Sequence, residues 1–347
     1  MKRRDFMVAG AAGASSLVLT HSAAEAMSMG HSHMGSSGND GFDTSLVGDY
    51  LDLTTPEGNR EAIGRINGNI DMETTKFGWF KGVVHGVRPN EKVRDLVGFT
   101  GFSAAKLLPS NDPEYPGYRK VLREVGFYTD LETGEVMEHW HNPYLDERVR
   151  VVPIANDPFN ELITAYNPPP PSYGGLNTEK REKIPMLLDW ERRGNDLNLA
   201  RRINLFYPAA LQPDKWPRES GNKFNRVSEM FLYHLNWDEM QNPDLTAVKA
   251  RGVWNRITPW LPWMLMGPTE GHCFYTCHFG AVDSLDYADP VAVEYARKHY
   301  PKYLEAPGPD AWEKDSLSSL EMYSREQTPA PLVNGILPEA PAPELPF

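Results

Sequence analysis

The sequence of 347 residues has no surplus of basic side chains and, after its first residues, no long apolar run. Lys and Arg number 35 against 47 Asp and Glu, which gives a formal net charge of −12. Nucleic-acid binding needs a surplus of Lys and Arg to contact phosphates, so this composition argues against a nucleic-acid partner. A permanent membrane span needs about 18 or more consecutive apolar residues, and we expect none after the N-terminal segment.

Cysteine is also scarce, because the sequence contains only Cys273 and Cys277. Two thiols cannot form a disulfide framework for a chain of this length. On one β-strand their Cα atoms would be about 13 Å apart, whereas a disulfide requires less than about 7 Å. A tight bend or a helix would bring them close enough, so the sequence does not decide whether they pair.

Two common catalytic motifs are missing from the sequence. No glycine-rich phosphate loop lies between an expected strand and an expected helix, which argues against a nucleotide cofactor. No Gly-x-Ser-x-Gly segment is present, which lowers the case for a serine hydrolase. We therefore expect a protein that works without a cofactor.

The first 26 residues have the order of an export signal. A basic start precedes an apolar run from Val8 to Leu19, and Ala24-x-Ala26 follows as a cleavage site. The pair Arg3-Arg4 before Phe6 is typical of a twin-arginine signal, although a general secretory signal with a chance arginine pair is the alternative. We expect a periplasmic protein, with the twin-arginine export machinery as a partner.

The remaining chain divides by composition into three parts. Residues 27–45 are rich in Gly, Ser, His and Met and are expected to form a flexible arm; copper binding by its Met and His side chains is the less favoured reading. Residues 46–325 are expected to form a single β-rich domain with a Pro-rich insertion at 166–180, although two β-domains joined there are the alternative. Residues 326–347 should be an extended Pro-rich tail.

Proline is abundant, with 30 residues, and this argues against a mainly helical chain. Short apolar runs alternate with turn-forming residues, as in antiparallel hairpins. These runs occupy residues 78–87, 92–102, 121–130, 134–141, 147–154, 200–208, 225–235, 246–257 and 271–282. We expect a mainly β protein, with an antiparallel meander closing into a calycin-like barrel or sandwich, peripheral helices and long Pro-rich loops.

Two helices are expected outside the strands. One is a short helix within residues 180–197. The other follows Asp289, a suitable N-cap, with Pro290 in the first turn and helical spacing of apolar residues as far as 306.

The segment "EVMEHWHNPYLDERVRVV" (135–152) lies at the centre of the functional prediction. With four-residue loops on either side, Asp130 pairs with Glu135, and Asn142 pairs with Glu147. Counting outward places Glu138 opposite Phe127 on the previous strand. Because side chains alternate along a strand, two sets of residues follow. One face collects Arg123, Val125, Phe127, Val136, Glu138, Trp140, Val149 and Val151, and the other collects Glu124, Gly126, Tyr128, Met137, His139, His141, Arg148 and Arg150.

The first of these faces is apolar except for Arg123 and Glu138, so it is expected to point inward unless a β-bulge swaps the faces. A carboxylate inside a cavity has its pKa raised by burial and lowered by a neighbouring arginine, which suits general acid–base chemistry. We therefore predict Glu138 as catalytic acid or base, Arg123 as its orienting partner and His234 as a second proton carrier. The structural alternative is a buried Arg123–Glu138 ion pair that only fixes the strand register.

A metal site is the less favoured reading of the same segment. His139 and His141 could bind one ion from one strand with a third ligand from elsewhere, for which His85, His234, His272 and His278 are candidates. Two-residue spacing alone is weak support for such a site, and the preferred register places both histidines outside.

The run "WNRITPWLPWMLMG" (254–267) concentrates large apolar side chains around two prolines, which preclude a regular central strand. We interpret it as an aromatic loop across the mouth or interior of the sheet; the alternative is a hydrophobic plug. Trp and Met side chains suit apolar rings and hydrocarbon skeletons. The predicted ligand-binding residues are Trp140, Phe127, Trp254, Trp260, Trp263 and Met264.

The run "GVWNRITPWLPWMLMGPTEG" (252–271) and the segment "REVGFYTDLETGEVMEHWHNP" (123–143) resemble a bacterial family, the domain of unknown function 1838 family, whose members are often twin-arginine exported. The resemblance covers roughly residues 60–285. It implies no activity, so the mechanism has to come from the side chains.

Together these features predict a periplasmic enzyme that acts by acid–base chemistry on a small hydrophobic or aromatic molecule. It would be a lyase, an isomerase or a hydratase without a cofactor. The alternative is a non-catalytic periplasmic binding or carrier protein with the same apolar cavity. An enzyme needs a titrating group at the ligand, whereas a carrier needs only shape and apolar lining.

Overall fold

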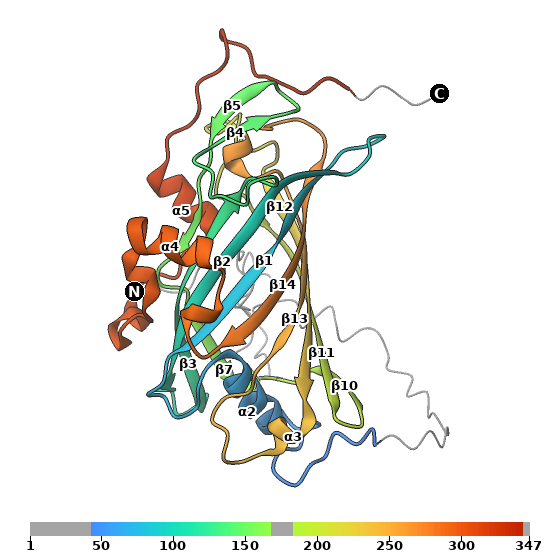
Figure 1. Ribbon diagram of the computed structural model, residues 1–347, viewed down its shortest axis with the longest axis vertical. Coiled ribbons are helices and arrows are strands. Elements are labelled where there is room, and N and C mark those ends of the chain that lie inside the picture. The colour runs from blue at the N-terminus through green and yellow to red at the C-terminus, as the bar shows by residue number, and fades with distance from the viewer. Residues whose placement is uncertain (1–42, 168–182, 343–347) are drawn as a thin grey trace.

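A ten-stranded antiparallel sheet dominates the computed structural model, which describes residues 43–167 and 183–342 (Figure 1). Neighbouring strands follow the order β10-β11-β12-β13-β14-β1-β2-β3-β6, and β7 also pairs with β3. The strands of this sheet are β1 (Lys76–Val87), β2 (Arg94–Pro109), β3 (Gly117–Thr129), β6 (Ile154–Asn156), β7 (Glu161–Thr164), β10 (Asp189–Arg193), β11 (Asp196–Pro208), β12 (Phe224–Asn236), β13 (Arg251–Thr258) and β14 (His272–Val282).

Two small hairpins lie outside this sheet. They are β4 (His139–Asn142) with β5 (Glu147–Arg150), and β8 (Tyr166–Asn167) with β9 (Ile184–Pro185). The mainly β, antiparallel class expected from the sequence is confirmed. No strand pairing within the described ranges joins β10 to β6 or β7, so the large sheet is open and not a closed barrel.

The sheet is strongly curved, and its concave side holds the main core. The hydroxyls of Tyr128 on β3 and Tyr275 on β14 lie 3.3 Å apart, although β1 and β2 separate these strands in the sheet. Trp254 of β13 is fully buried and contacts Tyr275, with 5.3 Å between ring centroids. The sheet must therefore curve strongly enough to bring side chains of non-neighbouring strands into contact on its concave face. Large aromatic rings are buried at the centre of that face.

Helices cover the convex side and one end of the sheet (Figure 1). Helix α4 (Pro290–His299) packs over β2 and β3, where its Tyr295 ring lies 5.0 Å from Phe127. Its N-cap is Asp289, as predicted, whose carboxylate accepts a hydrogen bond from the Val291 amide. The other helical segments are α2 (Pro56–Asn67), α3 (Trp237–Gln241), α5 (Ser319–Glu326), η2 (Pro262–Met264), η3 (Leu285–Tyr287), η4 (Pro301–Leu304) and η5 (Pro309–Glu313).

Helix α2 was not anticipated, although its start has an ordinary signal. Thr55 caps the helix by accepting a hydrogen bond from the Gly58 amide, and Pro56 follows at the first helical position. The buried Arg65 then ties α2 to α3 by donating to the main-chain oxygens of Met240, at 2.7 Å, and Asn242, at 2.8 Å. Helices α2 and α3 are therefore held together at one end of the sheet (Figure 1).

The prediction of a short helix within residues 180–197 is wrong. Residues 189–193 form β10, which pairs antiparallel with β11 through a turn at Gly194. Trp190 is buried while its neighbours Asp189 and Glu191 are exposed, which is strand alternation and not a helical period. The predicted export signal at 1–26, most of the arm at 27–45, most of the Pro-rich insertion and the last five residues lie outside the described residues.

Candidate functional site

A cavity of about 350 Å³ lies at the end of the sheet where β3 and β13 end and β14 begins. Four segments line it, namely residues 152–155, residues 209–225, residues 256–271 and helix α5, together with Tyr128 of β3 and Tyr275 of β14. The cavity is built from segments that are distant in sequence. It therefore depends on the whole domain and not on one motif.

The loop after β13, which contains the Trp- and Pro-rich run, forms much of the wall. Trp260 and Trp263 line the cavity, and Pro262 opens the short helix η2. The chain leaves η2 through Leu265, with a φ of 57°, a left-handed conformation uncommon for leucine. The Trp260 indole nitrogen donates to the Thr269 carbonyl at 2.9 Å, which closes the loop on itself.

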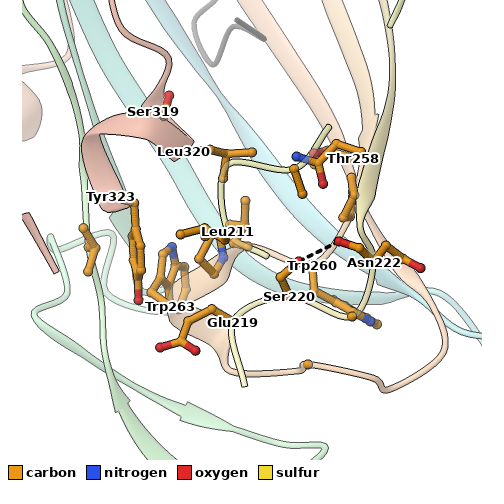
Figure 2. A pocket seen from close by; sticks show the side chains of 18 of the residues that line it. Leu211, Glu219, Ser220, Asn222, Thr258, Trp260, Trp263, Ser319, Leu320 and Tyr323 are labelled. Carbon is orange, nitrogen blue, oxygen red and sulfur yellow. Dashed lines mark hydrogen bonds between the residues drawn. The ribbon is translucent and has the colours of Figure 1, made fainter. Parts of the chain in front are cut away.

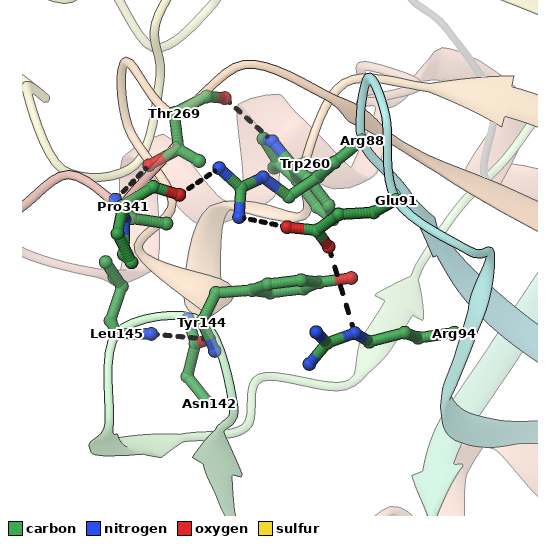
Figure 3. Close-up of polar contacts among 10 residues, drawn as sticks. Arg88, Glu91, Arg94, Asn142, Tyr144, Leu145, Trp260, Thr269 and Pro341 are labelled. Carbon is green, nitrogen blue, oxygen red and sulfur yellow. Dashed lines mark hydrogen bonds and ion pairs between the residues drawn. The ribbon is translucent and has the colours of Figure 1, made fainter. Parts of the chain in front are cut away.

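Distant segments fix this loop from outside (Figure 3). The Ala340 amide donates to the Thr269 hydroxyl at 3.1 Å, and Arg88 donates to the Pro341 carbonyl at 2.7 Å. On the other side, the Asn142 amide group donates to the Met264 carbonyl at 2.8 Å. The loop is thus held between the β4–β5 hairpin and the C-terminal segment.

Helix α5 and the segment before β12 complete the wall (Figure 2). Leu320 and Tyr323 come from α5, and Leu211 and Glu219 come from the segment between β11 and β12. Glu219 is buried, and burial raises the pKa of its carboxyl group. Its Oε1 accepts a hydrogen bond from the Ala330 amide, while its Oε2 is buried without a hydrogen-bond partner within the described ranges.

A buried cation, Arg256 of β13, also lines the cavity, and this residue is 5% exposed. Its Nε lies 3.7 Å from Oε1 of the buried Glu229, beyond hydrogen-bonding distance. The other oxygen of Glu229 accepts a hydrogen bond from the Trp254 indole at 3.0 Å. Burial raises the pKa of Glu229, and the charge of Arg256 opposes that shift.

Tyr128 and Tyr275 lie beside this pair and also line the cavity. Burial raises the pKa of the Tyr128 hydroxyl to about 12 and that of Tyr275 well above its ordinary value. Both phenols are therefore neutral near pH 7 and can donate hydrogen bonds. The Trp263 ring packs on Tyr128, with 4.9 Å between centroids, and its buried indole nitrogen makes no well-formed hydrogen bond in the described part of the chain.

Glu138 and Arg123 do not meet as the sequence analysis expected. The Asp130–Glu135 turn forms, because the Asp130 amide donates to the Glu135 carbonyl at 2.9 Å. Beyond one further bridge, however, the chain leaves β3, and β6 pairs there instead. Glu138 is consequently exposed, at the edge of a separate pocket of about 220 Å³ that Phe127 also lines.

Arg123 lies on the convex side of β3, where it pairs with a different acid. Its Nε is 2.9 Å from an Asp157 carboxylate oxygen, and Lys302 lies 2.9 Å from the other oxygen. The prediction of which face of β3 points inward is therefore wrong. Phe127 packs against α4 on the convex side, whereas Glu124 and Tyr128 point to the concave side. The second hairpin has the predicted register, with Trp140 opposite Val149 in the pairing of β4 with β5.

Three histidines of the prediction, His139, His141 and His234, lie at the surface, whereas the candidates His85 and His272 are partly buried. His234 is exposed on β12 and lies 2.8 Å from the Asn198 side chain. His139 is exposed, and His141 lies 3.1 Å from Asp146. Within residues 43–167 and 183–342, no group of three or more His, Cys, Asp or Glu side chains could hold a metal ion.

Three other predicted ligand-binding residues are buried in the core around the cavity and do not line it: Trp140, Trp254 and Met264. Trp140 packs edge-on against Trp263 from behind, with 5.6 Å between centroids. Trp254 is buried next to Arg256 on β13, and Met264 is buried against Cys273, whose sulfur lies 3.8 Å from the Met264 sulfur.

The two cysteines do not form a disulfide. Cys273 and Cys277 are free and buried on β14, and burial raises the pKa of the Cys273 thiol to about 12.

The sequence analysis missed Arg256, Tyr275 and Glu219. A signal for Arg256 was present, because it shares one face of β13 with Trp254 and is the only charged residue on that face. Glu219 lies in an irregular segment without a sequence pattern that would mark it.

The fold and the cavity define an antiparallel β protein with a ligand-sized cavity beside an aromatic loop. Residues 73–327 match the model of the family described as "Protein of unknown function (DUF1838)", and the chain belongs to this family. No curated protein and no solved structure gives a significant match. In the described part of the chain, no helix has the length and apolar character needed to cross a membrane.

Proposed function

We propose that the protein binds a small, mainly apolar molecule in the cavity beside the aromatic loop. The observation that carries this proposal is the cavity of about 350 Å³ with Trp260, Trp263, Leu211 and Leu320 in its walls. Cavities of roughly 300–1,000 Å³ with apolar walls and a few polar groups are typical of small-molecule sites. A hydrophobic or aromatic ligand suits these walls.

A carrier function is the simpler form of this proposal, because Glu138 and His234 lie outside the cavity. An acid–base enzyme is the second candidate, and Glu219 supports it. This carboxyl group lines the cavity, its pKa is raised by burial, and one of its oxygens is buried without a partner within the described ranges. A carboxyl group with a raised pKa at a ligand can transfer protons near neutral pH.

Filling the cavity tests the proposal. The neutral fluorophore N-phenyl-1-naphthylamine should bind the wild-type protein, and Leu320→Trp should weaken binding at least about tenfold, because the larger ring occupies the ligand volume. Leu332→Trp is the matched control, since Leu332 is 43% exposed outside the cavity. Equal binding by both variants would place the probe elsewhere.

Two measurements on the purified protein distinguish a carrier from an enzyme. Mass spectrometry of natively purified protein identifies the molecule that it retains. Glu219→Gln should leave the affinity for N-phenyl-1-naphthylamine unchanged in either case. If the protein is an enzyme, this variant should turn over the retained molecule about 10²–10⁴-fold more slowly. No turnover by the wild-type protein would leave the carrier function.

We also propose that the protein works in the periplasm. The support is the N-terminal order of Arg3-Arg4, apolar run and Ala24-x-Ala26. Replacing Arg3 and Arg4 by Lys should leave the precursor in the cytoplasm, as fractionation and immunoblotting would show. Normal export of the double variant would exclude the twin-arginine route.

A further inference from the structure

The polar end of the cavity has more hydrogen-bond donors than acceptors. Arg256 is charged at any physiological pH and carries five N–H groups. Its ion pair with Glu229 is loose, at 3.7 Å, and within the described ranges no protein acceptor hydrogen bonds to its guanidinium. A guanidinium that is 5% exposed and has so few acceptors is costly unless a further acceptor is supplied.

Neighbouring groups add to this excess of donors. The buried Trp263 indole N–H makes no well-formed hydrogen bond in the described part of the chain, although it lies near the Tyr128 hydroxyl, and both Trp263 and Arg256 line the cavity. Tyr128 and Tyr275 share one hydrogen bond of 3.3 Å, which uses only one of their two hydroxyl protons. One tyrosine proton therefore remains to be donated.

The protein itself offers few acceptors to these donors. One oxygen of Glu229 is occupied by the Trp254 indole, and the other faces Arg256 from 3.7 Å. Burial also raises the pKa of Glu229, so this group can take up a proton if a second carboxylate arrives beside Arg256. A bound molecule with two acceptor oxygens would satisfy several of these donors at once.

We propose that the ligand of this cavity is an apolar carboxylic acid, with its carboxylate held by Arg256 and its apolar body against Trp260, Trp263 and Leu320. This inference rests on the function proposed above. A carboxylate only accepts hydrogen bonds, and its two oxygens match the two Nη groups of a guanidinium. The Trp263 and tyrosine donors can complete its shell.

Competition between two matched probes tests this inference. Bound N-phenyl-1-naphthylamine is displaced with 2-naphthoate or with 2-naphthamide, which share one ring system and differ in charge. For the wild-type protein we expect 2-naphthoate to compete at least about tenfold more strongly, as a charge-assisted pair requires. In Arg256→Met this preference should disappear while the neutral fluorophore still binds.

Because Arg256→Met leaves Glu229 buried without its counter-charge, that variant can unfold. The double variant Arg256→Met/Glu229→Gln removes both charges and keeps an acceptor for the Trp254 indole. It should bind the fluorophore and show no preference for 2-naphthoate.

The outcomes separate this inference from the proposed function. Binding of the fluorophore without a preference for 2-naphthoate, or a preference that persists in the double variant, would overturn the carboxylate assignment and leave the cavity function standing. Failure of the fluorophore to bind, or equal binding by Leu320→Trp, would overturn the cavity function and the assignment with it.

Discussion

Replacing Lys120 with Met is expected to lower the free energy of unfolding by about 3–5 kcal/mol, since it removes one of the two cations that oppose the buried charge of Glu161, the other being Arg201. Lys120 of β3 and Glu161 of β7 lie 3.5 Å apart, and their side chains are 1% and 2% exposed. The substitution keeps the length and apolar volume of the side chain and removes its charge. Urea denaturation at pH 7 measures the effect.

The pH dependence of this variant identifies the cause. Burial raises the pKa of Glu161 in the folded protein, and loss of Lys120 removes a charge that opposes this shift. A carboxyl group with a raised folded-state pKa stabilises the protein at low pH and loses that contribution as the pH rises. Lys120→Met should therefore recover part of its stability at pH 5.

A paired substitution is the control for this prediction. Lys120→Met/Glu161→Leu removes both charges and should be more stable than Lys120→Met alone, because position 161 then no longer holds a buried carboxylate that has lost Lys120. A loss below about 1 kcal/mol in the single variant, with no pH dependence, would show that the pair is not a significant contributor to stability.

Trp254→Ala should have an effect of similar size, about 3–5 kcal/mol, because it removes the largest fully buried side chain. Its ring lies between Phe231, at 5.9 Å, and Tyr275, at 5.3 Å, on the concave face. The substitution leaves a cavity and also removes the indole donor to Glu229. Urea denaturation again provides the measurement.

Trp254→Phe separates these two contributions. Phenylalanine keeps most of the ring packing but leaves one oxygen of Glu229 without its donor, which should cost about 1–3 kcal/mol. If Trp254→Phe is as unstable as Trp254→Ala, the hydrogen bond and not the ring volume controls this position.

The strands were readable from the sequence, because alternation and turn residues are local signals. The expected runs at 78–87, 200–208 and 271–282 all lie within or along observed strands. The choice of inward face on β3 was not readable. Val125 and Phe127 are apolar because α4, far along the chain, covers them from the convex side. Both faces of the strand are buried, so an apolar face no longer identifies the interior.

The candidate site was only partly readable for a related reason. Trp260 and Trp263 could be assigned to a wall, since Pro259 and Pro262 prevent a regular strand there. The sequence analysis placed Glu138 in the interior because it continued the pairing with β3 beyond the point where that pairing ends. Its true register ends after the bridge between Thr129 and Val136, where the chain turns away to form β4. Local sequence holds no signal for that departure.

The pairing of β1 with β14 has a consequence for the order in which the protein folds. The strands from β10 to β14 and from β1 to β3 each pair with the next strand along the chain, whereas this seam joins Phe77 to Val282. Pairing of such distant segments is slow, because the loop-closure entropy must be lost before the contacts form.

The two sides of the seam can therefore form hairpins first, each from local contacts. The cavity takes Tyr128 from one side and Arg256 from the other, so it comes into existence only when the seam closes. The rise of N-phenyl-1-naphthylamine fluorescence during refolding would time that event. A bound ligand would then favour the last step of folding and not the first.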